Sequence, residues 1–122
     1  MSPVEDTIFG KITRGEIPTD FLYEDDRCVV IRDLYPQAPT HVLIIPRQPI
    51  AMLSAASEND QALLGHLLLV AGKIAEQLGV QDAFRLVINN GERGGQTVFH
   101  LHLHLLAGRD MKEGELAQGL AP

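Results

Sequence analysis

Three histidines recur at every second position, at His100, His102 and His104, inside the otherwise apolar segment 97–108. A period of two is typical of a β-strand, so the imidazoles share one face and the leucines between them share the other. At a rise of about 3.3 Å per residue, neighbouring imidazoles lie roughly 6–7 Å apart, which suits groups placed around one tetrahedral phosphorus. Because imidazole is costly to bury and adds little stability, the pattern indicates catalysis or metal binding.

A glycine-rich segment, 89–97, lies between an apolar strand predicted over 84–88 and the histidine strand. Asn-Gly and Gly-Gly pairs are strong turn signals, so this segment is predicted to join two antiparallel neighbours. Its glycines allow main-chain N–H groups to approach a bound anion, and Thr97 adds a hydroxyl. Next to the three histidines, the loop is predicted to form half of a phosphate site.

The elements that must position this site follow from hydrophobic periodicity. A short helix capped by Thr7 is predicted over 7–14, and a longer helix follows Ser57, runs over 63–78 and ends at Gly79. Strands are predicted over 21–23, 28–32, 41–45, 84–89 and 100–107. The chain is thus expected to be an α+β domain with about five mostly antiparallel strands.

Composition limits the class of protein. The chain has 122 residues, enough for one domain with a single core. Its 16 acidic and 10 basic residues give a net charge of −6, which argues against a nucleic-acid polymer as partner, because such binding depends on basic side chains. A mononucleotide needs only a few phosphate contacts, so a small-ligand pocket is expected.

The sequence predicts no membrane partner and a cytoplasmic location. The longest apolar stretch, 63–75, is too short and too polar for a membrane span, and the acidic amino terminus lacks the basic start of a signal peptide. The single cysteine, Cys28, excludes an internal disulfide and lies among apolar residues, so a buried structural thiol is expected. No cofactor is expected.

The segment 95–106 resembles the His-X-His-X-His-X-X signature of the histidine-triad (HIT) superfamily. Further segments are similar to its Hint branch, the histidine-triad nucleotide-binding proteins, at 7–12, 16–18, 24–28 and 36–46. The resemblance implies one HIT domain over 1–122 with a variable tail over 111–122. It also implies a homodimer in which the long helix and the following strand meet their copies, making one larger sheet. His66, on that helix, is expected to be a structural or interface residue.

The resemblance implies a role for each histidine of the site. His102 would attack phosphorus, and water would then hydrolyse the covalent nucleotidyl-imidazole. His100 would orient it through a main-chain carbonyl, while His104 with Thr97 would lie near the leaving group or a phosphate oxygen. His41 would lie behind the nucleophile and orient it. Which imidazole protonates the leaving group stays open.

The nucleotide would be held by residues outside the triad. Asp33 either begins a turn or accepts hydrogen bonds from the ribose hydroxyls, and the resemblance favours the ribose. The purine would lie in an apolar slot whose residues could equally be ordinary core, namely Ile8, Phe9, Ile12, Ile31 and Leu34. Asn89 matches a position that contacts the substrate near the phosphate. The loop residues Gly95, Gln96 and Thr97 complete the expected site.

The chain departs from animal members of the family at two places. They carry a further histidine after the Pro46 position and a tryptophan near the carboxyl terminus. Here those stretches read Arg47-Gln48-Pro49 and Met111-Lys112-Glu113-Gly114. The missing tryptophan and the divergent tail 115–122 leave the preference for a leaving group open.

The resemblance thus implies a metal-independent hydrolase of purine nucleoside phosphoramidates or acyl-nucleotidylates. One alternative is a dinucleoside polyphosphate hydrolase of the sister branch, which shares Gly-Gln-Thr-Val. A second is a zinc-binding protein, since His-X-His on a strand is also a metal-ligand spacing, although no carboxylate or thiol lies near the triad in the sequence. A third is a nucleotide-binding module without turnover. The choice between adenine and guanine stays open.

Overall fold

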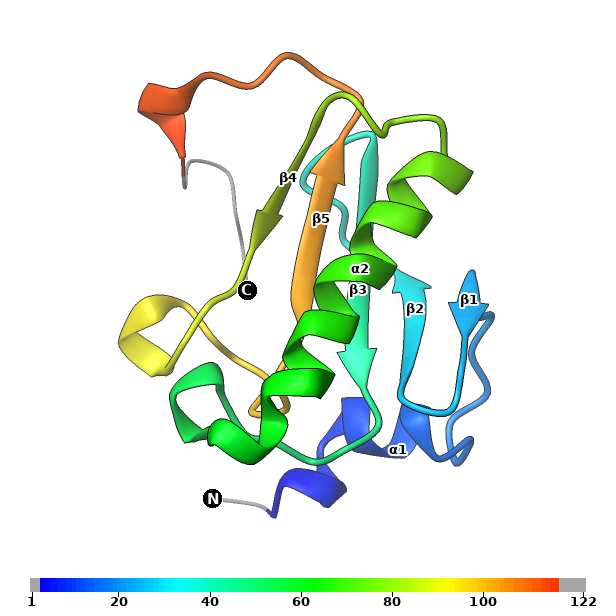
Figure 1. The fold of residues 1–122 in the computed structure, drawn as a ribbon, viewed down its shortest axis with the longest axis vertical. Helices are drawn as coiled ribbons and strands as arrows, with labels where there is room; N and C mark the ends of the chain where they lie inside the picture. The colour runs from blue at the N-terminus through cyan, green and yellow to red at the C-terminus, as the bar shows by residue number, and fades with distance from the viewer. Residues whose placement is uncertain (1–2, 117–122) are drawn as a thin grey trace.

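Five strands form one antiparallel sheet in the computed structural model, which describes residues 3–116 (Figure 1). They lie in the order β1-β2-β3-β5-β4, and their bounds are β1 Tyr23–Glu24, β2 Cys28–Arg32, β3 Thr40–Pro46, β4 Phe84–Val87 and β5 Leu103–Ala107. Two α-helices accompany the sheet, the short α1 (Ile8–Thr13) and the long α2 (Gln61–Gln77). The expected α+β class, with one short and one long helix, is confirmed.

Helix α2 covers one face of the sheet (Figure 1). Its buried side chains recur at helical spacing, and they pack against alternate residues of β3 and β5, including Val42, Ile44, Leu103 and Leu105. The leucines between the histidines therefore point into this core, as the period of two predicts. Their burial anchors β5, because removing apolar surface from water is the main favourable contribution to folding.

The opposite face carries α1 and a second apolar cluster. Ile12 of α1 packs against strand residues that point away from α2, namely Val29, Ile31, Leu43 and Ile45. Thr7 caps α1 as predicted, since its side-chain oxygen accepts from the N–H of Gly10 at 3.1 Å. Gly15 follows the helix with a φ of +77°, a left-handed conformation that glycine adopts without steric cost.

Several predicted boundaries are wrong. Ser57 caps a short 3₁₀ helix, Glu58–Asp60, and α2 begins only after it. Strand β5 begins at Leu103 instead of position 100, because the N–H of Leu101 donates to the carbonyl of Ile50 at 2.7 Å, outside the sheet. His100 and His102 therefore lie on the approach to the strand. Strand β1 ends at Glu24 instead of position 23, and β4 ends at Val87 instead of position 89.

Part of the apolar surface stays uncovered in the single chain. Leu68 and Leu69 of α2 are 54% and 71% exposed, and β4 forms an outer edge of the sheet. An exposed apolar surface of this kind is common where proteins associate. Over residues 3–116, no helix has both the length and the apolar character needed to cross a membrane.

Candidate functional site

Four histidines converge on the face of the sheet opposite α2. His41 lies on β3, His104 on β5, and His100 and His102 just before β5. All four are buried, with at most 6% of the residue exposed. The ring centroid of His104 lies 5.0 Å from that of His102 and 5.1 Å from that of His41. The separation of the His102 and His104 rings is shorter than the roughly 6–7 Å expected from the strand rise alone.

The main chain orients His102. Its Nδ1 lies 2.8 Å from the carbonyl oxygen of His100. A carbonyl oxygen only accepts, so Nδ1 carries the proton and Nε2 keeps a free lone pair. The ring of His100 points elsewhere, since its Nε2 donates to the carbonyl of Pro46 at 2.7 Å. Thus the backbone of His100 holds the middle imidazole, and its ring ties this segment to the end of β3.

Burial favours the neutral form of all four imidazoles. Desolvation lowers the pKa of His41, His100 and His102 below the ordinary value of 6.5. The pKa of His104 falls to about 4, because burial is reinforced by the neighbouring His102 and His41. A neutral His102 has its lone pair available at neutral pH, which is the state that a nucleophile requires.

The depressed pKa of His104 predicts that folding stability falls in acid. The unfolded chain takes up this proton near pH 6.5, whereas the folded chain does so only near pH 4. The unfolded state binds more protons between these values, so the contribution is complete above about pH 6.5 and is lost toward pH 4, by on the order of 3 kcal/mol. Urea unfolding of wild type and His104→Gln over this range measures the loss. Equal pH slopes in the two proteins would contradict the prediction.

Asp33 follows β2 and lies beside His41. Its Oδ1 accepts from the N–H of Tyr35 at 2.8 Å, and its Oδ2 lies 3.5 Å from Nε2 of His41. Donor atoms of Asp33, His41 and His104 all lie within 4.8 Å of one another, a composition that transition metals also accept. In the sequence no carboxylate or thiol lies near the triad. The fold brings a carboxylate to it, which weakens that argument against zinc.

The residues expected to line a purine slot separate into two groups. Ile12 and Ile31 are only 5% and 6% exposed and belong to the apolar cluster under α1. Ile8 and Leu34 are 49% and 85% exposed. The half-buried Phe9 packs edge-on against His102, with ring centroids 4.8 Å apart. Ile8, Phe9 and Leu34 are therefore the members with surface available to a ligand.

The glycine-rich loop differs from the expected anion nest. The N–H groups of Gly91, Gly94 and Gly95 all donate to acceptors within the loop itself. Gln96 is 2% exposed, and its side chain accepts from the N–H of Gly91 and donates to two backbone carbonyls. Its amide therefore holds the shape of the loop from inside, a role that no pattern in the sequence indicates.

The remaining residues expected near the phosphate lie at the end of β4 and beyond it. Asn89 and Gly95 line a hollow of about 470 Å³ beside β4. A Cβ on Gly95 would lie 3.8 Å from Cγ of Asn89, so the two residues are neighbours. Thr97 is exposed at the end of the loop. All three keep surface that a ligand could contact.

A second polar cluster, which the sequence analysis did not identify, centres on Asp25 in the β1–β2 turn. Its carboxylate accepts from the backbone N–H groups of Arg27 and Cys28, the hydroxyl of Tyr23 and Nε2 of His66 on α2, at 2.7–2.8 Å. Burial acts to raise the pKa of Asp25, but these hydrogen bonds hold it well below its usual range. His66 therefore has a structural role here, because it joins α2 to the hairpin.

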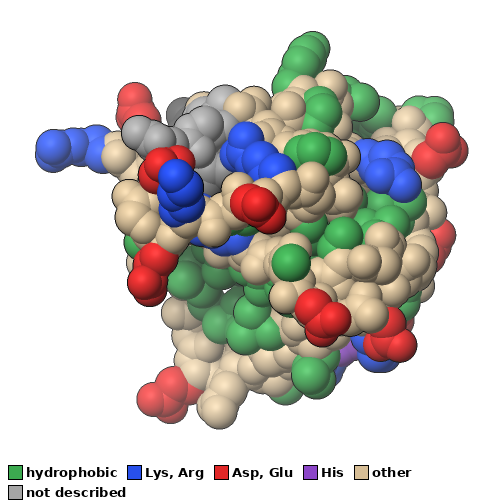
Figure 2. Space-filling model, turned by 90° about the horizontal axis from the view of Figure 1, so that it is seen from above, with side chains coloured by type: hydrophobic (Ala, Val, Ile, Leu, Met, Phe, Trp, Pro, Cys, Tyr) green, Lys and Arg blue, Asp and Glu red, His purple; other side chains and the backbone are tan. Residues whose placement is uncertain are grey.

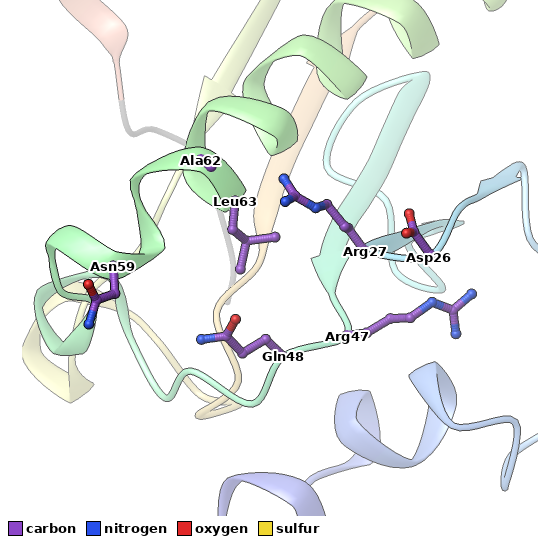
Figure 3. Close-up of a pocket in the computed structure, with 7 residues that line it drawn as sticks. All are labelled: Asp26, Arg27, Arg47, Gln48, Asn59, Ala62 and Leu63. Atoms are coloured by element: carbon purple, nitrogen blue, oxygen red, sulfur yellow. The ribbon is translucent and has the colours of Figure 1, made fainter.

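A separate hollow of about 210 Å³ is lined by residues of the hairpin, the segment after β3 and the start of α2, and these residues are labelled in Figure 3. Arg47 lines it, but its guanidinium donates to the carbonyl oxygens of Thr13 and Asp25 and so ties α1 to the hairpin. None of the four histidines lines this hollow. It lies outside the candidate site.

Comparisons with known proteins cover most of the chain. A family model described as HIT domain matches residues 14–111. A Synechocystis protein described as an uncharacterized HIT-like protein is 63% identical over 105 residues, which are 86% of this chain and 92% of that protein. The purine nucleoside phosphoramidase of Escherichia coli is 49% identical over 108 residues, 88% of this chain and 91% of that protein.

Solved structures of HIT and histidine triad proteins have a similar fold. A HIT family hydrolase from Legionella pneumophila matches with a TM-score of 0.86 at 44% identity, over 88% of this chain and 97% of that one. The histidine triad nucleotide-binding protein from Candida albicans matches with a TM-score of 0.74 at 33% identity, over 82% of this chain and 73% of that one. The sequence resemblance and the fold therefore agree.

Proposed function

Because the chain belongs to the HIT domain family, we propose that it hydrolyses purine nucleoside phosphoramidates and related acyl-nucleotidylates. The observation that carries the proposal is the orientation of His102, whose Nδ1 is tied to the carbonyl of His100 at 2.8 Å. This leaves the lone pair on Nε2 free next to His104. The name of the Escherichia coli relative supports the choice of substrate class.

The proposed reaction has two displacements at phosphorus. Nε2 of His102 forms a bond to phosphorus while the P–N bond of the substrate breaks, and the departing amine takes up a proton from the site or from water. Water then attacks phosphorus and gives up a proton to the site or to the solvent, which balances the proton taken by the amine. The bond to His102 breaks, and the nucleoside monophosphate leaves with the imidazole again neutral. Dividing one difficult displacement in this way is the usual advantage of a covalent intermediate.

The nucleotide contacts are part of the same proposal. Asp33 would accept hydrogen bonds from the ribose through its carboxylate, which lies beside His41. The purine would contact the accessible apolar residues Ile8, Phe9 and Leu34. Asn89, Gly95 and Thr97 would lie near the phosphate. The buried core residues Ile12 and Ile31 and the loop residue Gln96 would support these contacts from behind.

We also propose a homodimer and no nucleic-acid polymer as partner. The exposed Leu68 and Leu69 of α2 and the open edge of β4 are the surfaces that a second copy would cover. Figure 2 shows one face of the molecule, on which acidic and basic side chains are interspersed. Together with the net charge of −6, this favours a small nucleotide over a polyanion.

Turnover of a fluorogenic adenosine phosphoramidate, with and without chelator, tests the proposal. We expect hydrolysis that a chelator leaves unchanged and that is faster than hydrolysis of a diadenosine polyphosphate under the same conditions. The guanosine phosphoramidate, run in parallel, measures the preference for the base. Loss of hydrolysis on chelation would instead assign Asp33, His41 and His104 to a metal site. No hydrolysis of either substrate would contradict an enzymatic role.

A further inference from the structure

We propose that the backbone N–H of Gln37 is a positioning group of this site, because it fixes which nitrogens of His41 and His104 carry protons. The consequence is that His104 presents an N–H, and not a lone pair, to the substrate. The effect of this N–H on catalysis rests on the proposed function. The assignment of protons to His41 and His104 depends only on the hydrogen bonds between these groups.

The contact between Gln37 and His41 determines which nitrogen of His41 carries the proton. The N–H of Gln37 donates to Nδ1 of His41 at 3.0 Å. A backbone N–H has no acceptor capacity, so Nδ1 must be the acceptor in this contact. A neutral imidazole carries one proton, so that proton lies on Nε2 of His41.

A second contact of His41 agrees with this assignment. Oδ2 of Asp33 lies 3.5 Å from Nε2 of His41, and a carboxylate favours a proton on the nitrogen that faces it. The carboxylate is itself held by the N–H of Tyr35, which donates to Oδ1 at 2.8 Å. In the loop between β2 and β3, a backbone N–H thus contacts Nδ1 of His41, and a carboxylate held by another backbone N–H lies beside Nε2.

The tautomer of His41 determines the tautomer of His104. Nε2 of His41 and Nδ1 of His104 lie 2.9 Å apart. Since His41 donates, Nδ1 of His104 accepts, and the proton of His104 lies on Nε2. Among the described residues this buried Nε2 has no hydrogen-bond partner. A buried donor without a partner is costly, so it calls for an acceptor on the ligand.

His102, the proposed nucleophile, has the opposite tautomer to His104. The carbonyl of His100 fixes the opposite tautomer on His102, whose Nε2 carries the lone pair. The ring centroids lie 5.0 Å apart, so two neighbouring rings carry a lone pair on Nε2 of His102 and a proton on Nε2 of His104. A phosphoryl group matches both, because its phosphorus accepts the lone pair and its oxygens accept the hydrogen bond. With the other tautomer, His104 would turn a lone pair toward those oxygens and repel them.

The chain offers a matched pair of variants at position 37. Gln37→Ala keeps the N–H and removes only the side chain, whose Nε2 donates to the carbonyl of Tyr35 at 3.2 Å. Gln37→Pro removes the N–H, since proline has none. Because proline also restricts the backbone, a third protein made by semisynthesis carries an ester in place of the amide at residue 37. The ester removes the same N–H with little change in shape.

The direct readout is the ¹⁵N spectrum of the imidazoles in the folded, ligand-free protein, since protonated and unprotonated ring nitrogens have distinct shifts. We expect Gln37→Ala to keep the wild-type pattern, and the ester and proline variants to show His104 partly protonated on Nδ1. We also expect kcat of these two variants to fall about 10–100-fold, with KM little changed, as for other groups that orient an active-site imidazole.

Two results would overturn the proposal. One is an ester variant with the ¹⁵N pattern and kcat of wild type. The other is an alanine variant that changes as much as the ester variant, because the side chain and not the N–H would then be responsible. The spectrum needs no substrate, so it decides the tautomer even if wild type fails to hydrolyse phosphoramidates. Failure of the proposed function and failure of this inference are thus separate results.

Discussion

His102→Ala is expected to lower kcat for a purine nucleoside phosphoramidate by about 10⁴-fold or more. The substitution removes the lone pair that would attack phosphorus, and none of the other three imidazoles of the site is held with Nδ1 on a backbone carbonyl. Affinity for the nucleoside monophosphate should change little, because ribose and base would be held by Asp33 and the apolar residues of α1. Steady-state kinetics and calorimetric titration with AMP measure the two effects.

His66→Ala serves as the control for this substitution. It also removes an imidazole, but one that lies on α2 and contacts Asp25 at 2.7 Å, away from the site. We expect it to keep kcat near the wild-type value while stability decreases. If His102→Ala retained wild-type turnover, the covalent mechanism would have to be abandoned.

Asp25→Ala is expected to lower the free energy of unfolding by about 2–4 kcal/mol. The carboxylate accepts four hydrogen bonds, so its removal leaves the donors of Tyr23, Arg27, Cys28 and His66 without their acceptor. It also disconnects α2 from the β1–β2 hairpin. Urea unfolding monitored by circular dichroism at neutral pH measures the loss.

Asp26→Ala is the matched control, because Asp26 is the exposed neighbour of Asp25 in the same turn. A surface substitution of this kind changes stability by at most about 0.5 kcal/mol. The assignment of Asp25 as the structural centre of the hairpin fails if the two variants unfold at the same urea concentration.

Much of the fold could be predicted from periodicity alone. Alternating histidines and leucines indicated a strand with two chemically different faces, and Thr7 marked the start of α1. The family resemblance of the triad segment was confirmed by the HIT domain match. These features are local, so a short stretch of sequence contains all the residues that determine them.

The parts that could not be predicted depend on backbone groups or on contacts between distant segments. The start of β5 was misplaced because a contact from Leu101 to Ile50 replaces the sheet ladder there. The glycines of the loop were expected to offer free N–H groups, but the buried amide of Gln96 and the loop carbonyls take up those of Gly91, Gly94 and Gly95. The carboxylate of Asp33 reaches His41 only through the pairing of β2 with β3.

The positions of the protons on the imidazoles could not be predicted from the order of side chains in the sequence. The groups that set it are a carbonyl of His100 and an N–H of Gln37, and every residue except proline carries both groups. Only the three-dimensional position of the chain shows which of them meets an imidazole.

The stereochemical course at phosphorus tests the central claim most directly. An adenosine 5′-thiophosphoramidate of known configuration is hydrolysed by the wild-type enzyme in H₂¹⁸O, and the configuration of the chiral product is determined. Two successive in-line displacements, through His102 and then through water, predict net retention of configuration. Net inversion would show that water attacks the substrate directly, and it would contradict the covalent nucleotidyl-histidine intermediate.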